Sequence, residues 1–341
     1  MKRWYLYPFS VLYHIGTSFR NKAYDIGLFR STSFRTPIIN VGNLSVGGSG
    51  KSPMVMYLAE LLSKRYRTGV LSRGYGRKTK GYKITNYDSN YKMVGDEAMQ
   101  LFERFKNKFV IGVCEDRVFG AKKIISDMDL GVLILDDAYQ HRSIKAGFNI
   151  LMTDYNDPYF KDFILPAGDL RESRNGMKRA DVIMVSKCPS DITEEKKRYY
   201  ISRIKPTPHQ EVYFSTISYD ENVFSKTEKL PDNNLAYYDI LLITGIANPK
   251  PLLKHLDRFA KKVKHLKFPD HHSFSDADVK KIVGEYKKMG DYKLILTTEK
   301  DYVRLKTFDQ LREKLYYWPI NVEIDRVEDF NNKIINYVRK I

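Results

Sequence analysis

The sequence predicts an α/β fold, in which a mostly parallel sheet is flanked by helices and a second, smaller α/β domain follows. From residue 37 onward, short apolar runs alternate with amphipathic stretches, and this alternation is typical of parallel strands covered by helices. The chain has 341 residues, which exceeds the usual size of a single hydrophobic core. Two domains are therefore expected.

The first series of elements extends to about residue 204. Strands are expected where short apolar runs occur, and helices where apolar residues recur with the helical period. The expected strands are residues 38–41, 68–72, 109–113, 132–135, 149–153 and 182–186, and the expected helices are residues 52–66, 96–105, 116–126 and 194–204.

A proline-containing segment separates this series from the next. Residues 205–234 contain Pro206, Pro208 and Pro231 and few periodic apolar positions, which indicates a junction. Further elements are expected at 240–244, 249–259, 263–268, 276–288, 294–297 and 327–339. We therefore divide the chain into an N-terminal amphipathic segment (1–35), a phosphate-loop domain (36–210) and a second α/β domain with the junction (211–341), whose final helix is free to pack back on the first domain.

A glycine-rich loop lies between the first expected strand and the first expected helix. Glycines let successive backbone N–H groups turn toward one anion, and the helix N-terminus adds partial positive charge. The strict motif would have glycine where Ser45 stands, and a flexible turn that caps a helix is the alternative. A lysine that reaches the phosphates and a serine that holds Mg²⁺ favour a nucleotide site in a P-loop NTPase-like fold. The loop residues are Gly47, Gly48, Ser49, Gly50, Lys51 and Ser52.

Two carboxylates, Asp136 and Asp137, follow the expected strand 132–135. The carboxyl end of a neighbouring parallel strand lies beside the phosphates that such a loop binds, and Mg²⁺ prefers oxygen ligands. Together with the glycine loop, the pair indicates a metal site. A later loop adds Arg171 and Arg174 as candidate phosphate clamps and Glu172 as a candidate metal ligand, although an ordinary solvated loop has the same composition.

Asp96 begins an expected helix, and it has two interpretations. Acidic residues in a first turn interact favourably with the helix dipole whatever the function, whereas a general base would take a proton from a hydroxyl nucleophile. His271 and His272 are adjacent and cannot both readily face one metal, so a zinc site is not expected. A dyad of a histidine with Asp96 or Asp270 remains open.

The charge balance implies an anionic partner. Lys and Arg number 58 against 41 Asp and Glu, which gives a net charge of +17. Nucleic acid, an acidic membrane face and a phosphorylated substrate all satisfy this requirement. The two cysteines, Cys114 and Cys188, suit neither a disulfide framework nor a zinc site, which indicates a reducing, cytosolic setting.

The first 35 residues combine aromatic and basic side chains. No apolar run approaches the ~20 residues needed to span a bilayer, and no small-residue cleavage site follows. A helix here would place an apolar stripe opposite a polar face, as in helices that lie at a membrane surface. Packing of the same stripe on the domain's own core is the equal alternative. The stripe would consist of Trp4, Val11, Leu12, Ile15 and Phe19, opposite Ser10, His14, Thr17 and Asn21.

The ordered set of short motifs resembles the tetraacyldisaccharide 4′-kinase family, and the resemblance covers nearly the whole chain. Each motif alone is weakly diagnostic, but their order is specific. The motifs are the stretch from Val41 to Pro53, Ser72-Arg73-Gly74-Tyr75-Gly76, Gly95-Asp96-Glu97, Asp116-Arg117, Leu135 to His141, Leu165-Pro166-Ala167-Gly168, Leu170-Arg171-Glu172, Gly245-Ile246-Ala247-Asn248-Pro249, Phe268-Pro269-Asp270-His271 and Thr298-Glu299-Lys300-Asp301.

The resemblance implies transfer of the γ-phosphoryl group of ATP, with Mg²⁺, to an acylated glucosamine disaccharide 1-phosphate at the cytoplasmic face of the bacterial inner membrane. Asp96 would then be the base, supported by His271, while Lys51 and the glycine loop bind ATP. The implied metal ligands are Ser52, Asp136, Asp137 and Glu172, and the candidates for substrate or transition-state contacts are Arg73, Arg117, Gln140, His141 and Arg171.

Two rival functions come from other classes. A basic ATPase that acts on nucleic acid would need a stacking platform or a groove-reading helix, and the sequence contains no recognisable motif of this kind. A non-enzymatic membrane-surface module would not need an intact Lys51-Ser52 together with Asp136-Asp137. We therefore expect an anionic membrane surface as partner, no nucleic acid and no obligate protein partner.

Overall fold

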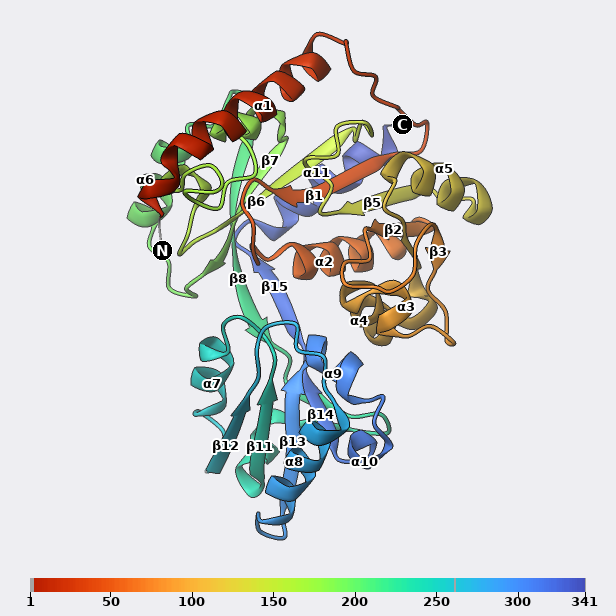
Figure 1. Cartoon of the computed structure of the whole chain (residues 1–341), viewed down its shortest axis with the longest axis vertical. Helices are drawn as coiled ribbons and strands as arrows, with labels where there is room; N and C mark the ends of the chain where they lie inside the picture. Colours follow the sequence, from red (N-terminus) through yellow and green to blue (C-terminus); the bar gives the residue numbers. More distant parts are fainter. Residues whose placement is uncertain (1–2, 261, 341) are drawn as a thin grey trace.

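The computed structural model describes residues 3–260 and 262–340, which form two α/β units, each built on one sheet. Figure 1 shows the larger unit above the smaller one, with two long strands running between them. The larger sheet has nine strands in the order β15-β8-β7-β6-β1-β5-β2-β4-β3, and the smaller has six in the order β10-β9-β14-β13-β11-β12. This architecture confirms the predicted α/β class.

The larger sheet is parallel from β8 to β4, and its edge strands β15 and β3 pair antiparallel. Its central strand β1 lies between β5 and β6, so the glycine loop after β1 lies beside the carboxyl ends of both neighbours. The strands are β1 (Ile38–Asn43), β2 (Thr68–Ser72), β3 (Lys83–Ile84), β4 (Val110–Val113), β5 (Val132–Asp136), β6 (Phe148–Asp154), β7 (Val182–Cys188), β8 (Glu211–Tyr219) and β15 (Ile320–Ile324).

Helices cover both faces of this sheet. On one face α2, α4 and α11 bury Leu58, Phe102 and Phe330 against strand residues such as Ile134, while α5 buries Ile124 on the opposite face. The helices of this unit are α2 (Lys51–Ser63), α3 (Tyr91–Val94), α4 (Asp96–Phe105), α5 (Arg117–Met128), α6 (Glu194–Ile204) and α11 (Val327–Arg339). Short 3₁₀ helices cover Trp4–Leu6, Lys106–Lys108, Tyr159–Lys161, Arg174–Arg179 and Asp232–Tyr237.

The smaller unit has a mixed sheet with its own core. Strands β12, β11, β13 and β14 are parallel, and β9 and β10 extend them antiparallel. Its strands are β9 (Asn222–Phe224), β10 (Lys229–Pro231), β11 (Asp239–Thr244), β12 (Lys262–Lys267), β13 (Lys293–Thr298) and β14 (Leu315–Trp318), and its helices are α7 (Lys250–Leu256), α8 (Asp276–Lys287), α9 (Glu299–Leu305) and α10 (Asp309–Arg312).

The structure differs from the domain boundary expected at residue 210. Strand β8 begins at Glu211 and pairs with β7, and β15 returns to pair with β8, so both belong to the larger sheet. The final helix α11 also packs on that sheet. The junction interpretation rests on Pro206, Pro208 and Pro231 and on few periodic apolar positions. However, a run of β-branched and aromatic residues that favours a strand follows Pro208.

The N-terminal helix α1 (Tyr7–Asp25) docks through its polar face. The hydroxyl of Ser10 donates to the Ile164 carbonyl at 2.9 Å, and Asp25 pairs with Arg142 at 2.7 Å. The apolar stripe remains exposed: Trp4 is 82% and Phe19 is 69% accessible. The expected two-faced pattern is therefore confirmed, and packing of the stripe on the protein's own core is wrong. Among the described residues, no helix is both long and apolar enough to cross a membrane.

Replacing Phe330 tests the placement of α11. Its buried ring contacts Tyr213 with centroids 5.3 Å apart, so Phe330→Ala should lower the free energy of unfolding by about 3–5 kcal/mol through a cavity in the larger core. The control Asn332→Ala alters an exposed position of the same helix and should change stability by less than about 0.5 kcal/mol. Denaturant unfolding measures both; similar stability of the two variants would contradict the packing.

Candidate active site

The loop between β1 and α2 forms a cradle of backbone groups. Gly47 and Gly50 have φ values of +110° and +79°, in the left-handed region that favours glycine. The Ser186 hydroxyl donates to the Ser49 carbonyl at 2.8 Å, and a Cβ on Gly50 would lie 3.2 Å from that hydroxyl oxygen. The end of β7 therefore packs directly against the loop, and a side chain in place of Gly50 would be both crowded and strained at its positive φ.

Polar atoms in this cradle fit an anionic ligand. The side chains of Asn43 and Ser49 are buried, and neither Asn43 Nδ2 nor Ser49 Oγ has a partner among the described residues. Helix α2 starts at Lys51 without a side-chain cap, so its N-terminal positive end is not neutralised by a carboxylate cap. Buried donors without partners are costly. A phosphate group would satisfy them.

Lys51 lies at the mouth of the loop. Its Nζ donates to Asn43 Oδ1 at 3.2 Å and to the Gly47 carbonyl at 3.4 Å, and it lies 3.7 Å from Asp137 Oδ1. Burial lowers the pKa of Lys51, and the charges of Asp137 and Asp136 oppose this shift. The ammonium group is thus held among acceptors where incoming phosphate oxygens can replace them.

Asp136 ends β5 beside the loop and Asp137 follows it, as the sequence predicts. Burial, followed by the charge of Asp137, raises the pKa of Asp136 to about 7. Asp137 adopts a φ of +51° and accepts from Arg171 Nη1 at 3.1 Å through both oxygens. Adjacent carboxylates beside a phosphate cradle are an oxygen-ligand set that suits Mg²⁺. Such a cation would favour ionised Asp136, because it offsets the repulsion between the two carboxylates.

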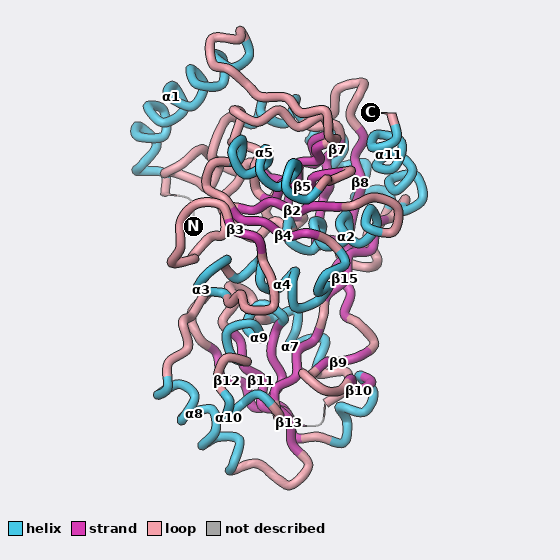
Figure 2. The backbone as a smooth tube through the Cα atoms, turned by 90° about the vertical axis from the view of Figure 1, so that its right-hand side faces the viewer, coloured by secondary structure: helices cyan, strands magenta, loops and turns pink. Residues whose placement is uncertain are grey.

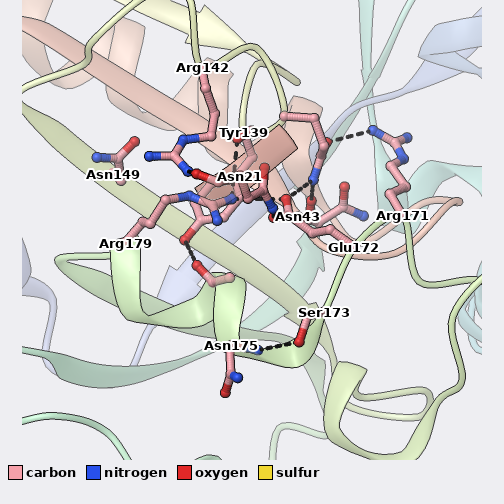
Figure 3. Close-up of polar contacts among 12 residues, drawn as sticks. Asn21, Asn43, Tyr139, Arg142, Asn149, Arg171, Glu172, Ser173, Asn175 and Arg179 are labelled. Atoms are coloured by element: carbon pink, nitrogen blue, oxygen red, sulfur yellow. Dashed lines mark hydrogen bonds and ion pairs between the residues drawn. The ribbon is translucent and has the colours of Figure 1, made fainter. Parts of the chain in front are cut away.

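Glu172 lies in a buried network that joins α1 to the core. It is 0% exposed, its Oε1 accepts from Gln140 and Arg179 at 2.9 and 2.8 Å, and its Oε2 accepts from Asn21 of α1 at 2.8 Å. Figure 3 shows Asn21 and Arg179 grouped around this carboxylate. Because both oxygens already have donors, the geometry favours a structural role, and metal binding by Glu172 stays a prediction.

The other predicted contact residues near the carboxylates differ in burial. Arg117 is buried beneath them, where it donates to the Cys114 carbonyl and to the Asp136 carbonyl at 3.5 Å. Burial lowers the pKa of Arg117 to about 10. Arg73 is exposed, and its charge acts on Arg117. Burial, with the charges of Arg117 and Arg73, lowers the pKa of His141 to about 4. The arginines among these candidates thus supply positive charge around the carboxylates, while His141 is held neutral.

Asp96 does not cap its helix. The cap position of α4 is Gly95, which has a φ of +91° and no side-chain cap. The Asp96 carboxylate instead accepts from Arg304 and lies 3.4 Å from His271 Nδ1. His272 turns away, with Nε2 3.0 Å from Asp278. The structure therefore brings together the predicted pair Asp96 and His271.

Glu97 links this dyad to the glycine-loop site. Its charge contributes to the raised pKa of Asp136, and it lies 3.6 Å from Lys300. Lys300 Nζ in turn lies 2.9 Å from His271 Nε2. The exposed Tyr75 ring lies 5.8 Å from the His271 ring. A phosphate cradle, two carboxylates and a carboxylate–histidine pair thus share one region between the two units.

Comparison with known proteins assigns the family. A profile described as tetraacyldisaccharide-1-P 4′-kinase matches residues 2–339. The tetraacyldisaccharide 4′-kinase of Flavobacterium johnsoniae is 43% identical over 337 residues, which cover 98% of this chain and 97% of that relative. The enzyme of the same name from Bacteroides thetaiotaomicron is 41% identical over 355 residues, which cover 98% of this chain and 93% of the relative. This chain belongs to the tetraacyldisaccharide 4′-kinase family.

A solved structure supports the same assignment. The crystal structure of LpxK from Aquifex aeolicus in complex with ATP is 31% identical, has a TM-score of 0.79, and covers 99% of both chains. This likeness confirms the P-loop kinase fold and the family resemblance expected from the sequence.

Several residues that contact the site are not predicted from the sequence. Arg304 and Arg179 contact the predicted residues Asp96 and Glu172. Lys187 donates to the Gly48 carbonyl and to Asp154 at 2.7 Å. Lys300 stands in one of the family motifs without an assigned role. The partner of Arg304 is 208 residues away, so no local pattern indicates the contact.

The pKa of His141 gives a stability prediction. Because its folded pKa of about 4 lies below the usual 6.5, the unfolded chain binds a proton between these values and the folded chain does not. Acidification through this window therefore lowers the free energy of unfolding. His141→Gln should lose less stability than the parent between pH 7 and pH 5, as measured by urea unfolding. Equal losses in both proteins would contradict the neutral state of the half-buried His141.

Proposed function

We propose that this chain transfers the γ-phosphoryl group of ATP to the 4′-hydroxyl of an acylated glucosamine disaccharide 1-phosphate, a late step of lipid A biosynthesis. The observation that carries the proposal is the geometry of two groups of residues: Lys51 of the glycine loop lies beside Asp137, and Asp96 is paired with His271. Family membership and the likeness to an ATP complex support the same reaction.

The residues divide the reaction between binding and proton transfer. Backbone donors of Gly47–Gly50 and the Lys51 ammonium hold the phosphates, while Arg171 and Arg117 add positive charge. Asp96 accepts the proton of the substrate hydroxyl while the hydroxyl oxygen forms a bond to the γ-phosphorus. The bond between the γ-phosphorus and the bridging oxygen breaks, so that ADP leaves with the electron pair. Bound Mg²⁺, held by Ser52, Asp136 and Asp137, would neutralise phosphate charge.

The proposal gives one explanation for two features of the protein, its high positive charge and its exposed N-terminal stripe. An acylated disaccharide phosphate is an anionic lipid, and the protein carries a net charge of +17. Helix α1 exposes its apolar stripe, while other side chains of the helix bond to the loop that carries Arg171 and Glu172. A peripheral position at the cytoplasmic face of the inner membrane would bring the lipid headgroup toward this loop.

Replacing Lys51 tests phosphoryl transfer. With γ-labelled ATP and tetraacyldisaccharide 1-phosphate in detergent micelles, the parent protein should label the lipid, and Lys51→Ala should lose ~10²-fold or more in kcat because charge stabilisation of the transition state is lost. Lys64→Ala, an exposed position at the end of α2, removes the same charge and should retain activity. No labelled lipid from the parent, or equal rates for Lys51→Ala and the parent, would contradict the proposal.

Replacing Asp96 tests the base. Asp96→Asn retains an oxygen that accepts from Arg304 but cannot accept the hydroxyl proton, so kcat should fall by ~10²–10⁴-fold while ATP binding stays near normal. Asp88→Asn changes an exposed carboxylate on the preceding loop and serves as the control. Single-turnover rates and ATP titration separate chemistry from binding. Turnover by Asp96→Asn at the control's rate would exclude this role.

Replacing the exposed stripe tests the membrane surface. A variant with Trp4, Leu12 and Phe19 changed to serine keeps the polar docking contacts of α1, and its binding to phosphatidylglycerol vesicles should weaken at least ~10-fold through lost apolar burial. Changing the exposed Tyr237 and Tyr292 of the smaller unit to serine should leave binding unaltered. Cosedimentation measures both, and undiminished binding of the stripe variant would contradict peripheral attachment through α1.

A further inference from the structure

A single buried arginine of the smaller unit reaches the Asp96 carboxylate in the larger unit. Arg304 lies on α9 and is 2% exposed. Its Nε donates to Asp96 Oδ1 at 3.1 Å and its Nη2 donates to Asp96 Oδ2 at 2.5 Å. A two-point contact between a planar guanidinium and a carboxylate fixes both the position and the rotation of the carboxylate.

The same guanidinium also holds the segment that presents His271. Its Nη1 donates to the His272 carbonyl at 3.1 Å, while Asp96 Oδ2 lies 3.4 Å from His271 Nδ1. His271 itself has a φ of +56°, a conformation that non-glycine residues adopt at some energetic cost. Arg304 therefore contacts both partners of the dyad, one through the side chain and one through the following peptide.

Arg304 is itself oriented from within the smaller unit. Its Nη1 lies 3.5 Å from Asp301 Oδ1, and Asp301 is fully buried. The second oxygen of Asp301 accepts from the Gly245 amide and from the Thr298 hydroxyl, both at 2.8 Å. A Cβ on Gly245 would lie 2.9 Å from Asp301 Oδ1. The end of β11 thus connects through Asp301 and Arg304 to the carboxylate on α4.

We propose that Arg304 is a positioning residue for phosphoryl transfer, which holds the Asp96 carboxylate and the His271 peptide segment in register for the acceptor hydroxyl. This inference rests on the proposed function of Asp96 as base. An ionised carboxylate has about four acceptor positions, so the contacts with Arg304 and His271 leave room for the substrate hydroxyl. The smaller unit then takes part in catalysis by fixing the geometry of a base that it does not carry.

A second arginine provides a matched control. Arg104 crosses the same α4–α9 contact, where it pairs with Glu299 at 3.3 Å and donates to the Ile320 carbonyl at 2.7 Å. It joins the two units without contacting Asp96 or His271. If Arg304 only holds the units together, substitutions of the two arginines should affect activity alike.

The experiment compares Arg304→Lys, Arg304→Ala, Arg104→Lys and Arg104→Ala in the full chain, with the transfer assay described above. Misplacement of a base lowers kcat, so the Arg304 variants should lose at least ~10-fold in kcat while KM for ATP changes less than ~3-fold. The lysine variant keeps the charge but lacks the two-point contact, so it remains informative if the alanine variant does not fold. The Arg104 variants should retain kcat within ~3-fold of the parent.

A double substitution decides whether Arg304 acts through Asp96. In the Asp96→Asn background, Arg304→Lys should reduce kcat by much less than it does in the parent, because residues that act as a unit are not additive. Fully additive losses, equal losses in the Arg104 variants, or an unchanged kcat in Arg304→Lys would overturn the inference. The parent protein is assayed first: an inactive parent contradicts the proposed function, whereas an active parent with insensitive Arg304 variants contradicts only the role of Arg304.

Discussion

The ion-paired contact between α4 and α9 is the constraint on which the rest of the site depends. The glycine loop, Asp136 and Asp137 belong to the larger unit, whereas His271, Lys300 and Arg304 belong to the smaller unit. Helix α4 carries Asp96 and Glu97 at the junction, and α9 meets it through charged pairs along its length. Figure 2 shows these two helices side by side between the units.

Proton transfer needs groups within hydrogen-bond reach. The reaction therefore depends on the relative position of the two sheets. A buried two-point pair such as Arg304–Asp96 fixes that position better than the half-buried, single-point lysine pairs do.

The glycine-loop site also depends on interactions between charged groups. Burial lowers the pKa of Lys51 and raises the pKa of Asp136, so in both cases burial disfavours the charged form that phosphate and metal binding would use. Neighbouring charges oppose both shifts: those of Asp137 and Asp136 act on Lys51, and those of Lys51 and Arg117 act on Asp136. Lys51 lies beside Asp137, which is paired with Arg171. A nucleotide phosphate with its cation would replace these internal pairs with stronger ones. Binding and ionisation are therefore coupled, and the surrounding arginines are positioned before the ligand arrives, which is the arrangement that electrostatic catalysis requires.

Sequence reasoning located the parts of this site that depend on local patterns. The glycine loop, the acidic end of β5 and the bounds of α4, α6 and α11 follow from motif spacing and helical period, and the family motifs correctly paired Asp96 with His271. Long-range contacts could not be predicted in this way. The segment after Pro206 and Pro208 forms strand β8 of the larger sheet. Local propensity does not show which sheet it joins, because its pairing with β7 decides this. Metal binding by Glu172 stays a prediction, but its donors Asn21, Gln140 and Arg179 come from other segments and no local pattern indicates them. Exposure of the α1 stripe was undetermined for the same reason, since a period shows which residues share a face and not what that face contacts.

The most direct test of the two-unit site is a crystal structure of the chain with Mg²⁺ and a non-hydrolysable ATP analogue. The account predicts that the terminal phosphate lies against Lys51, that the cation contacts the Asp136–Asp137 pair, and that the Asp96 carboxylate, still held by Arg304, faces that phosphate across a gap that one hydroxyl oxygen can fill. A nucleotide bound elsewhere, or a terminal phosphate from which Asp96 is turned away with its Arg304 contact broken, would contradict it.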